Sequence, residues 1–481
     1  MSRRTKIVAS IGPASDSPAT LKALVAAGMD MARLSLAHSP LEETLIRLDR
    51  IRKVAHEQDK FVGVLADLPG PKVRAAEFPE GGVLLTDGSL IDLVAGDGQE
   101  TSDDRRIVID HPSGLLGLED GDTVALGDGA IQLLVRTVHA DRASAEVVTG
   151  GWALGRPGVA LPPGRIPICS PTPADLRLLE TLVEADVDAI AISFVQSASD
   201  IDRAREAVAG RGPMLIAKIE TQDAVDALDD IIASADGVMV ARGDLGIRCA
   251  LEDVPHYQKR IIRSGVAYGR PVITATQMLE SMVRAPTPTR AEVSDIANAV
   301  FDGTSALMLS GETAIGHDPA GAVATMAKIA VRAEREFNYQ SWGHNLGRQQ
   351  ITETRGAPAP VRITAAISAA AWRAASDAEV TAIIACTNSG ATARAISRFR
   401  PEMPLLAATP SERTARQLSV AWGITPVLIE RRGSTDDIVW FAIKSAVDLG
   451  VVKTGDVVAV LAGSPDDPEA TTDELRLVRV T

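Results

Sequence analysis

The chain of 481 residues is long enough for about three domains of roughly 150 residues each, which excludes a peptide or a lone small module. With 63 acidic and 49 basic residues, the net charge of -14 argues against a nucleic acid or an anionic membrane as partner. Apolar runs such as Val187–Val195 fall far short of the roughly 20 residues of a membrane-spanning helix, and the N-terminus lacks a signal-peptide pattern. Three widely spaced cysteines indicate neither disulfides nor zinc. We therefore expect a soluble, cytoplasmic protein.

The first two thirds of the chain alternate short apolar runs with amphipathic helical stretches, a pattern typical of parallel strands joined by crossover helices. Eight strands are predicted, at Thr5–Ile11, Met29–Leu34, Phe61–Leu65, Val187–Phe194, Met214–Ile219, Gly237–Val240, Pro271–Ala275 and Ser305–Leu309. The helices predicted between them include Pro18–Ala27, Leu41–Gln58, Gln222–Ala235, Val254–Tyr268 and Arg290–Phe301. Eight such units predict a (β/α)8 TIM barrel.

Between the third and fourth predicted strands lies a segment of a different kind, Arg74–Arg165, which has no long helical pattern. Short alternating runs at Thr123–Leu126, Ile131–Val138 and Ala145–Val148 are separated by glycine-rich turns. We expect a small β-barrel lid domain inserted where it can cap the barrel.

A polar connector follows Glu336 and precedes a second α/β series. Its predicted strands are Val380–Ala385, Pro404–Ala408, Pro426–Ile429 and Val457–Leu461, with helices near Ile363–Ala375, Thr392–Phe399 and Glu412–Trp422. This pattern indicates a separate C-terminal doubly wound α/β domain. The predicted boundaries are 1–70 and 167–340 for the two parts of the barrel, 71–166 for the lid and 351–481 for the C-terminal domain.

Unusual polar residues follow the predicted barrel strands, at the end where the chemistry of such barrels gathers. They are Arg33, Asp67, Lys218, Glu220, Arg242, Asp244, Thr276, Gln277 and Glu312. Each alone is more often part of a structural ion pair than a catalyst. Their convergence on one rim favours an active site.

Lys218 and Glu220 are two residues apart, so on an extended strand both side chains point to the same side. Asp244 follows the next strand, within the run ARGDLG (Ala241–Gly246), where a helix can begin and offer backbone N–H groups to an anion. Two carboxylates beside a lysine and an arginine suit one hard divalent cation such as Mg²⁺. The alternative is a buried network of ion pairs that holds the barrel closed.

Several stretches of the chain together resemble the pyruvate kinase family over nearly the whole sequence. The matching stretches are TKIVASIGP (Thr5–Pro13), GPKVR (Gly70–Arg74), AKIE (Ala217–Glu220), MVARGDLGI (Met239–Ile247), ITATQMLESM (Ile273–Met282), PTRAEVSDIANAVFDGTSALMLSGETA (Pro288–Ala314) and GITPVL (Gly423–Leu428). The family's three-domain organisation agrees with the arrangement predicted above, and the family is usually a homotetramer.

The resemblance implies transfer of the phosphoryl group of phosphoenolpyruvate to ADP, which gives pyruvate and ATP. It implies Mg²⁺ or Mn²⁺ on Glu220 and Asp244, and the substrate phosphate on Arg33. It also implies that Gly243, Asp244 and Thr276 bind the carboxylate end of the substrate. Lys218 would stabilise the transferring phosphoryl group and the developing enolate. The catalytic residues expected are thus Lys218, Arg33 and Thr276.

The loop after the second strand departs from the family pattern. The family usually reads NFSHG where this chain has SLAHS (Ser35–Ser39), and threonine where this chain has Leu68 after Asp67. These positions normally build a potassium site. Lys72 stands where potassium-dependent members carry glutamate, so we expect its ammonium, with Asp67, to substitute for K⁺, which is then not required. The alternative is a solvent-facing lysine at the lid hinge.

The resemblance places the nucleotide at Ser35, His38 and Arg74, although Ser35 replaces an asparagine and Ser197 replaces a lysine that many members use. In the C-terminal domain, TNSGAT (Thr387–Thr392) resembles an effector phosphate loop, and plain helix capping is an equally good interpretation. The acidic run SPDDPEATTDE (Ser464–Glu474), where the family has a glycine-rich loop, argues against activation by a sugar bisphosphate.

Three functions remain open at the level of sequence. The first is a potassium-independent pyruvate kinase of glycolysis. The second is a metal-dependent, enolate-forming decarboxylase or lyase that acts on a 2-oxo acid, and the third is a phosphoenolpyruvate-binding sensor without efficient kinase activity. Intact Arg33, Lys218, Glu220, Asp244 and Thr276 favour an enzyme over the sensor, and the lid with His38 and Arg74 favours the kinase.

Overall fold

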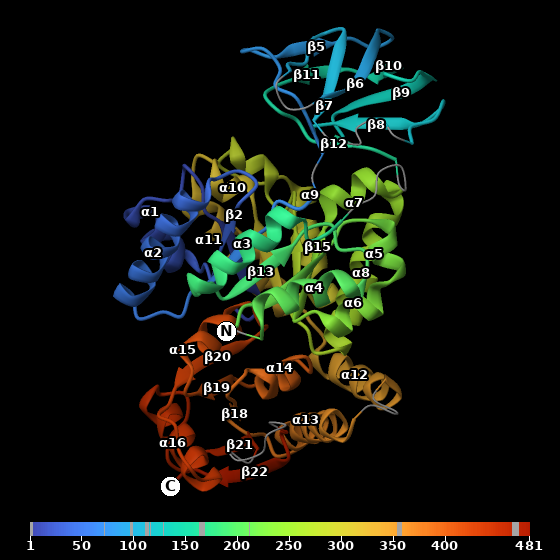
Figure 1. Cartoon of the computed structure of the whole chain (residues 1–481). Helices are drawn as coiled ribbons and strands as arrows, with labels where there is room; N and C mark the ends of the chain where they lie inside the picture. The colour runs from blue at the N-terminus through green and yellow to red at the C-terminus, as the bar shows by residue number, and fades with distance from the viewer. Residues whose placement is uncertain are drawn as a thin grey trace.

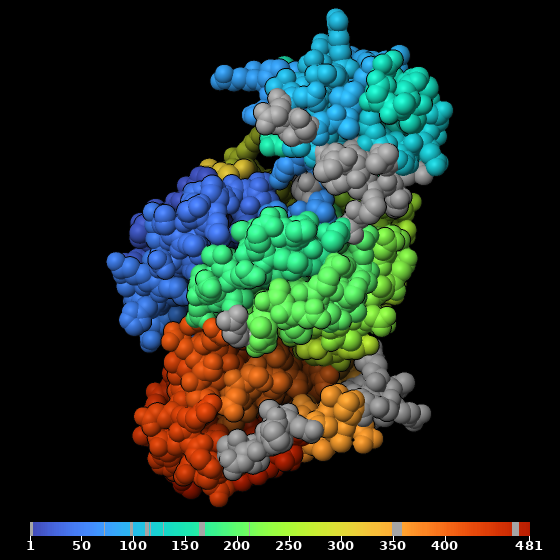
Figure 2. Space-filling model, in the orientation of Figure 1, coloured from blue at the N-terminus to red at the C-terminus, as the bar shows by residue number. Residues whose placement is uncertain are grey.

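The computed structural model of the chain describes residues 3–71, 73–96, 100–110, 115, 117–127, 129–162, 169–210, 212–353, 358–463 and 471–481, and for 349–353 the backbone only. Three parts are stacked in space (Figure 1). A β domain lies at the top, an α/β barrel in the middle and a second α/β domain at the bottom. The space-filling view shows the same three masses in contact (Figure 2).

The central part is a closed barrel of eight parallel strands in the order β1-β17-β16-β15-β14-β13-β3-β2. The predicted TIM barrel is therefore confirmed, and each predicted strand is present with ends shifted by a few residues. The strands are β1 (Lys6–Ser10), β2 (Met31–Ser35), β3 (Gly63–Asp67), β13 (Ala189–Ile192), β14 (Met214–Ile219), β15 (Gly237–Ala241), β16 (Val272–Ala275) and β17 (Ala306–Leu309).

Helices surround this barrel, and most begin at a side-chain cap, such as Ser17 before α1 and Thr289 before α9. The stretch predicted as one helix at Gln222–Ala235 is two short helices, α5 and α6, with Ala227 between them. The helices are α1 (Pro18–Ala27), α2 (Leu41–Glu57), α3 (Pro173–Glu184), α4 (Ala198–Val208), α5 (Gln222–Asp226), α6 (Leu228–Ser234), α7 (Arg242–Arg248), α8 (Val254–Ala267), α9 (Arg290–Asp302), α10 (Gly311–Ala314) and α11 (Pro319–Glu334).

The barrel strands are buried on both faces, as their nearly continuous apolar sequences predict. One set of side chains packs under the helices, and the other fills the barrel interior. The interior set includes Val8, Met31, Leu65, Met239 and Met308, and Val420 of the C-terminal domain enters it from the lower end. The lower end of the barrel is thus filled, so the opposite end, where the strands finish, is left for chemistry.

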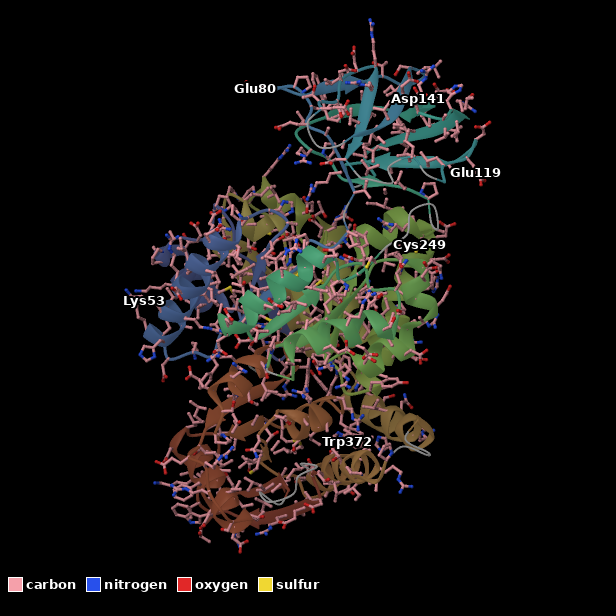
Figure 3. The ribbon with its side chains drawn as sticks, in the orientation of Figure 1. Lys53, Glu80, Glu119, Asp141, Cys249 and Trp372 are labelled. Atoms are coloured by element: carbon pink, nitrogen blue, oxygen red, sulfur yellow. The ribbon has the colours of Figure 1, made fainter. Side chains whose placement is uncertain are left out.

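The inserted domain stands between β3 and β13, at the end of the barrel where these strands finish (Figure 1). It contains a seven-stranded sheet in the order β12-β8-β9-β10-β6-β7-β4 and a small β11-β5 pair, which together form a nearly closed β-barrel. Its strands are β4 (Arg74–Ala75), β5 (Val83–Leu85), β6 (Leu90–Gly96), β7 (Arg106–Asp110), β8 (Thr123–Leu126), β9 (Ile131–Val138), β10 (Arg142–Thr149), β11 (Gly151–Ala153) and β12 (Val159–Ala160). Glu80, Glu119 and Asp141 project from its outer surface, so part of the acidic excess lies away from the barrel (Figure 3).

The C-terminal part has a five-stranded sheet in the order β20-β19-β18-β21-β22. Alternate residues of β18 face opposite ways, Ile383 toward α13 and α14 and Ile384 toward α16, which confirms the doubly wound arrangement. The strands are β18 (Ala382–Cys386), β19 (Leu405–Thr409), β20 (Ile424–Leu428), β21 (Val457–Ala462) and the antiparallel edge strand β22 (Glu474–Arg479). The helices are α12 (Tyr339–Glu353), α13 (Ala359–Asp377), α14 (Ala391–Ser397), α15 (Glu412–Gln417) and α16 (Thr435–Asp448).

Three of these elements were absent from the sequence prediction: β22, α16 and α12. The polar segment predicted as a connector after Glu336 is mostly helix α12, and Trp342 anchors it by donating its indole N–H to the Arg398 carbonyl at 2.8 Å. Among the residues that the structure describes, no helix has the length and apolar character needed to cross a bilayer.

Polar contacts fasten the C-terminal domain to the lower end of the barrel. Arg416 pairs with the fully buried Asp188 at 2.8 Å, and the Lys6 ammonium donates to the Ile424 carbonyl at 2.9 Å. Burial alone raises the pKa of Asp188, and the nearby Arg52 and Arg416 guanidinium groups oppose that rise without cancelling it. Removing one partner of such a buried ion pair would leave the other charge unpaired, so these interactions hold the two domains together.

Candidate active site

A chain of ion pairs crosses the mouth of the barrel and joins four residues that the sequence singled out. Arg33 Nη2 lies 2.6 Å from Asp67 Oδ2, Asp67 Oδ1 lies 3.3 Å from Lys218 Nζ, and Lys218 Nζ lies 2.9 Å from Glu220 Oε1. Their side chains are 16%, 3%, 12% and 0% exposed, in that order. The structure thus brings together residues from three strands, as predicted, in a nearly buried cluster.

Strand geometry explains why these four side chains meet. Lys218 and Glu220 alternate with Ile219, which packs in the core beneath the helices, so the two charged side chains share the opposite side. On the neighbouring strands β2 and β3, the register pairs Ser35 with Asp67 and therefore places Arg33 one pleat below. Carboxyl ends of parallel strands meet at one rim, which brings these positions together.

The charges of this cluster depend strongly on one another. Burial by itself would raise the pKa of Asp67, but Lys218 and Arg33 outweigh burial and hold that pKa below its usual value. Burial would lower the pKa of Lys218, whereas Asp67, Glu220 and Asp244 together raise it above the ordinary value for lysine. Lys218 therefore remains an ammonium ion in the buried site.

Glu220 is the fully buried carboxylate of the cluster. Burial raises its pKa to about 7, against the opposing effect of Lys218, and Asp244 adds to the rise. Its Oε2 accepts the Phe194 backbone N–H at 2.5 Å, and its buried Oε1 contacts the Lys218 ammonium at 2.9 Å. Such an oxygen, in a cluster where Asp67, Glu220 and Asp244 outnumber two cations, is suited to a further cation.

The donor set fits a hard divalent ion that keeps most of its own oxygen ligands. Glu220 and Asp244 supply carboxylate oxygens, the ligand type that Mg²⁺ prefers. Across the described ranges, no group of three or more His, Cys, Asp or Glu side chains is arranged to hold a metal. Two protein carboxylates, with water and substrate completing the shell, are consistent with Mg²⁺ and not with a structural zinc site.

Arg242 and Glu312 belong to the rim by sequence position, but the structure corrects the expectation that they converge on the site. Arg242 Nη1 donates to both carboxylate oxygens of Asp295, at 2.8 and 2.6 Å, and its Nη2 donates to the Thr276 carbonyl at 2.6 Å. Glu312 accepts the backbone N–H groups of Leu279 and Ser310 at 2.9 and 2.7 Å. The polar atoms of both side chains are hydrogen-bonded to other parts of the protein, so both residues hold loops in place.

The loop held by Arg242 has an unusual backbone. Thr276 and Gln277 have φ of 68° and 52°, a left-handed conformation that is unfavourable for residues with a side chain. The Thr276 hydroxyl accepts the Gly243 N–H at 2.8 Å and donates to the Ala275 carbonyl at 2.6 Å. Gly243 and Thr276 are therefore brought together, next to Asp244, at the start of α7.

The residues expected for the nucleotide lie on two different domains. Ser35 ends β2, and His38 follows it as an exposed side chain on the barrel. Arg74 begins β4 of the lid, where its Nη1 donates to the Arg156 carbonyl at 3.2 Å. Lys72, expected to replace K⁺, lies outside the described residues.

A pocket lies between the lid and the barrel beside Asp244. From the barrel, Phe194, Ile247 and Arg248 line it, and the Arg248 guanidinium lies 4.7 Å from the centre of the Phe194 ring. From the lid, it is lined by Ala125, Gly129 and Gly158–Ala160. Cys249, directly after α7, marks the same end of the barrel in Figure 3.

Sequence reasoning missed two groups at this site. Ser193 accepts the Lys218 ammonium at 2.8 Å and donates to the Leu68 carbonyl at 2.8 Å, so it orients the lysine. Phe194, Ile247 and Arg248 form the pocket wall. The residues that lead up to Ser193 look like an ordinary strand. The only sequence signal for a role of Ser193 was its position directly after β13.

Comparison with known proteins agrees with this geometry. The family model "Pyruvate kinase, barrel domain" matches residues 2–323, and "Pyruvate kinase, alpha/beta domain" matches residues 365–478. A pyruvate kinase of Methylorubrum extorquens is 40% identical over 480 residues, which cover 100% of this chain and 98% of the relative. A pyruvate kinase of Clostridium acetobutylicum is 37% identical over 478 residues, which cover 99% of each. A pyruvate kinase of Staphylococcus epidermidis is 38% identical over 479 residues, 99% of this chain and 80% of the relative. With both domains and its full length matched, the chain belongs to the pyruvate kinase family.

Proposed function

We infer that the chain is a phosphotransferase that moves the phosphoryl group of phosphoenolpyruvate to ADP and gives pyruvate and ATP. The observation that carries this assignment is the buried cluster of Arg33, Asp67, Lys218 and Glu220 at the mouth of a barrel of this family. The lid is retained and lines a pocket with Asp244 at the same end of the barrel, which supports a kinase over the alternatives.

The mechanism rests on positioning and electrostatics. Phosphoryl transfer passes through a loose transition state with negative charge on the equatorial oxygens, so fixed cations around those oxygens lower the barrier. We assign the substrate phosphate to Arg33, and the transferring phosphoryl group and the enolate oxygen to Lys218. When bound, a divalent cation on Glu220 and Asp244 would neutralise further charge on these oxygens.

The carboxylate end of the substrate is assigned to the start of α7. There the Gly243 N–H, the Asp244 position and the Thr276 hydroxyl lie together. The Gly243 N–H donates to the Thr276 hydroxyl in this structure, so a substrate carboxylate would bind there by replacing that hydrogen bond with its own. Asp67 does not touch substrate in this proposal, but its two ion pairs set the positions of Arg33 and Lys218.

A coupled assay with phosphoenolpyruvate, Mg²⁺ and ADP tests the assignment. We expect pyruvate to form only when ADP is present. Pyruvate release without ADP would support the enolate-forming decarboxylase or lyase instead, and binding of phosphoenolpyruvate without turnover would support the sensor. Either result would overturn the kinase assignment.

Independence from K⁺ is proposed from the loop residues. Leu68, in place of the usual threonine, is buried in the main core and offers only its backbone oxygen, which accepts Ser193. Asp67 already has two cationic partners. In this proposal the Lys72 ammonium takes over the electrostatic role of a monovalent cation, whose usual oxygen ligands are reduced at Ser35, Ala37 and Leu68.

We expect the rate to stay the same when K⁺ is replaced by a non-activating cation such as tetramethylammonium. Lys72→Glu is expected to lower the rate in K⁺-free buffer by about tenfold or more, because a carboxylate replaces the ammonium that the proposal puts in the role of K⁺. Lys60→Glu, at an exposed position on the barrel, is the control and should leave the rate unchanged. Strong activation of the unmodified enzyme by K⁺ would contradict the proposal.

Arg242 is proposed as a positioning residue for substrate. Arg242→Lys removes the planar guanidinium group, which donates to Asp295 and to the Thr276 carbonyl at the same time. We expect the KM for phosphoenolpyruvate to rise about tenfold, the cost of one charged hydrogen bond, with a smaller change in kcat. Arg52→Lys, which similarly loses contacts to two carbonyls and Asp188 at the lower end of the barrel, should leave KM unchanged. Equal KM changes in both variants would show a general loss of stability.

Further properties follow from family membership and are part of the same proposal. We propose Mg²⁺ or Mn²⁺ as cofactor, a homotetramer, a cytoplasmic location and ADP binding at Ser35, His38 and Arg74. The loop Thr387–Gly390 before α14 is closed by the Gly390 N–H on the Thr387 hydroxyl at 2.9 Å, which is compatible with capping or with anion binding. Asp466 and Asp467, which argued against a bisphosphate effector, lie outside the described residues.

A further inference from the structure

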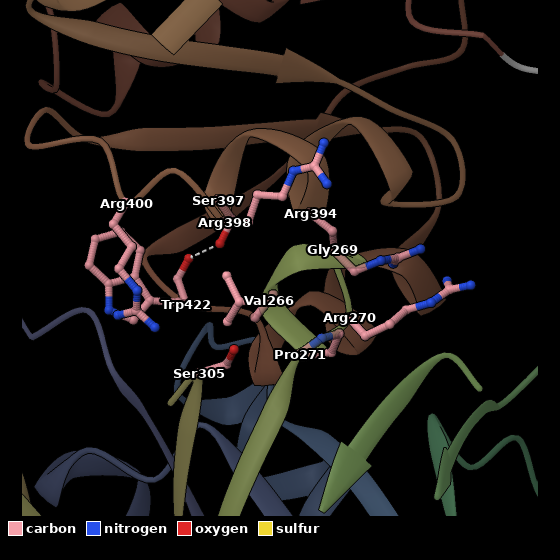
Figure 4. A pocket seen from close by; sticks show the side chains of 11 residues that line it. Val266, Gly269, Arg270, Pro271, Ser305, Arg394, Ser397, Arg398, Arg400 and Trp422 are labelled. Atoms are coloured by element: carbon pink, nitrogen blue, oxygen red, sulfur yellow. Dashed lines mark hydrogen bonds between the residues drawn. The ribbon is translucent and has the colours of Figure 1, made fainter. Parts of the chain in front are cut away.

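A second pocket lies between the barrel and the C-terminal domain (Figure 4). It opens around Gly269–Pro271, which precede β16, whereas Thr276 of the active site follows that strand. The pocket is therefore at the opposite end of the barrel from the active site. Its remaining lining residues are Val266, Ser305, Arg394, Ser397, Arg398, Arg400, Ala421 and Trp422.

Two of the arginines that line this pocket come from different domains and make few hydrogen bonds. Arg270 comes from the barrel, and its Nη2 donates to the Ala233 carbonyl at 3.1 Å, but its buried Nε has no hydrogen-bond partner. Arg394 comes from α14, and its Nη1 donates to the Ser389 carbonyl at 3.2 Å. Burial lowers the pKa of Arg394 to about 10, and Arg270 lowers it further in the same direction. Two guanidinium groups of like charge thus line one pocket.

The nearby negative charge does not balance them. Asp236 is the carboxylate that acts on both arginines, but its Oδ2 also pairs with Arg205 at 3.1 Å and accepts the Leu215 N–H at 3.0 Å. The pocket is also lined by Arg398 and Arg400, so positive charge is in excess there, which suits an anion such as phosphate.

Arg400, in the same lining, has a different role. Its guanidinium donates to the carbonyls of Gly303 and Thr304 and lies against the rings of Phe337, Trp342 and Trp422. At 2% exposure it holds the domains together and is not available to a ligand. Arg398 likewise donates to the Ala267 carbonyl at 2.9 Å. The ligand-binding capacity of the pocket rests on Arg270 and Arg394.

We propose that this pocket binds a phosphate group between Arg270 and Arg394. Each guanidinium presents two parallel N–H donors that match the spacing of phosphate oxygens, and burial strengthens such pairs. The chemistry is shared by inorganic phosphate and by the phosphate of a monoester. Because one arginine belongs to each domain, the bound group links the barrel to the C-terminal domain, and the protein is stabilised in proportion to occupancy.

Titration of the full-length protein with inorganic phosphate tests the proposal, by calorimetry and by the melting temperature, against potassium chloride at matched ionic strength. We expect saturable binding and a rise in melting temperature. Arg270→Gln and Arg394→Gln should each weaken the affinity about tenfold, the effect of losing one charged pair. Arg263→Gln, an exposed position on the neighbouring helix α8, should bind as the unmodified protein does.

The variants also separate ligand binding from a structural role. Without phosphate, both glutamine variants should melt no lower than the unmodified protein, because each removes a repulsive charge. A structural role would lower the melting temperature equally with and without phosphate, and would overturn the proposal. Arg270→Lys keeps the charge but not the fork, and should show an intermediate affinity.

Phosphate that binds at the active site instead would bind equally well to the variants that lack Arg270 or Arg394. Unchanged affinity in Arg270→Gln and Arg394→Gln, or no saturable effect of phosphate on the unmodified protein, would refute the proposal. A parallel titration with glycerol phosphate separates the sources of the group. If glycerol phosphate binds at least as tightly as inorganic phosphate, and its binding depends on the two arginines, the natural ligand is an organic phosphate. If inorganic phosphate binds more tightly, the ligand is the free ion.

Discussion

Lys218→Met is expected to lower the rate of phosphoryl transfer by about three orders of magnitude or more while the chain stays folded. Lys218 is the cation held between Asp67 and Glu220, and it is the group assigned to the transferring phosphoryl group. Methionine fills a similar volume but has no charge, so the transition-state charge loses its fixed partner. The measurement is kcat in the coupled assay, with circular dichroism to check the fold.

The buried surroundings of Lys218 make a control necessary. Its removal leaves Asp67 with Arg33 alone and Glu220 without its cation, which costs some stability. Lys259→Met removes another lysine ion pair of the barrel, with Asp302 on α9, where the lysine is 44% exposed. This control should keep normal kcat. Near-normal turnover in Lys218→Met would refute the role assigned to this lysine.

Glu220→Gln is expected to weaken Mg²⁺ binding by about 10- to 100-fold, since a charged ligand oxygen is replaced by a neutral amide. The main structural reason to place the cation there is that Glu220 is fully buried, in a cluster whose three carboxylates outnumber its two cations. Mg²⁺ affinity is measured by calorimetry, and the Mg²⁺ concentration for half-maximal activity gives a second value. Both should move together.

Glu312→Gln is the matched control for that experiment. Glu312 is also a buried glutamate that follows a barrel strand, but both of its oxygens accept backbone N–H groups. We expect Glu312→Gln to lower the melting temperature without changing Mg²⁺ affinity, because the amide can accept only part of these bonds. Equal Mg²⁺ affinity in Glu220→Gln and the unmodified protein would remove Glu220 from the metal site.

Local patterns predicted most of the barrel. The strands β1, β2 and β14 lie where short apolar runs stood, because a strand buried on both faces needs a continuous apolar sequence. Helix α9 also lies at its predicted position, Arg290–Asp302 against the predicted Arg290–Phe301, and Thr289 caps its start. Elements without such a signal were missed. The antiparallel strand β22 alternates with charged residues at the sheet edge, and α12 is polar apart from the few residues that pack inward.

The eight-stranded barrel, the inserted lid and the polar residues at the strand ends could be predicted from the amino-acid sequence, because burial and strand period depend on neighbouring residues. Which of those polar residues meet depends on how the whole chain folds. Lys218 and Glu220 face the mouth with Asp67, whereas Arg242 turns to Asp295, 53 positions away, and becomes a support. The pocket between Arg270 and Arg394 likewise exists only because two domains dock. Such contacts depend on where residues far apart in the sequence lie in space, so a local sequence pattern cannot predict them.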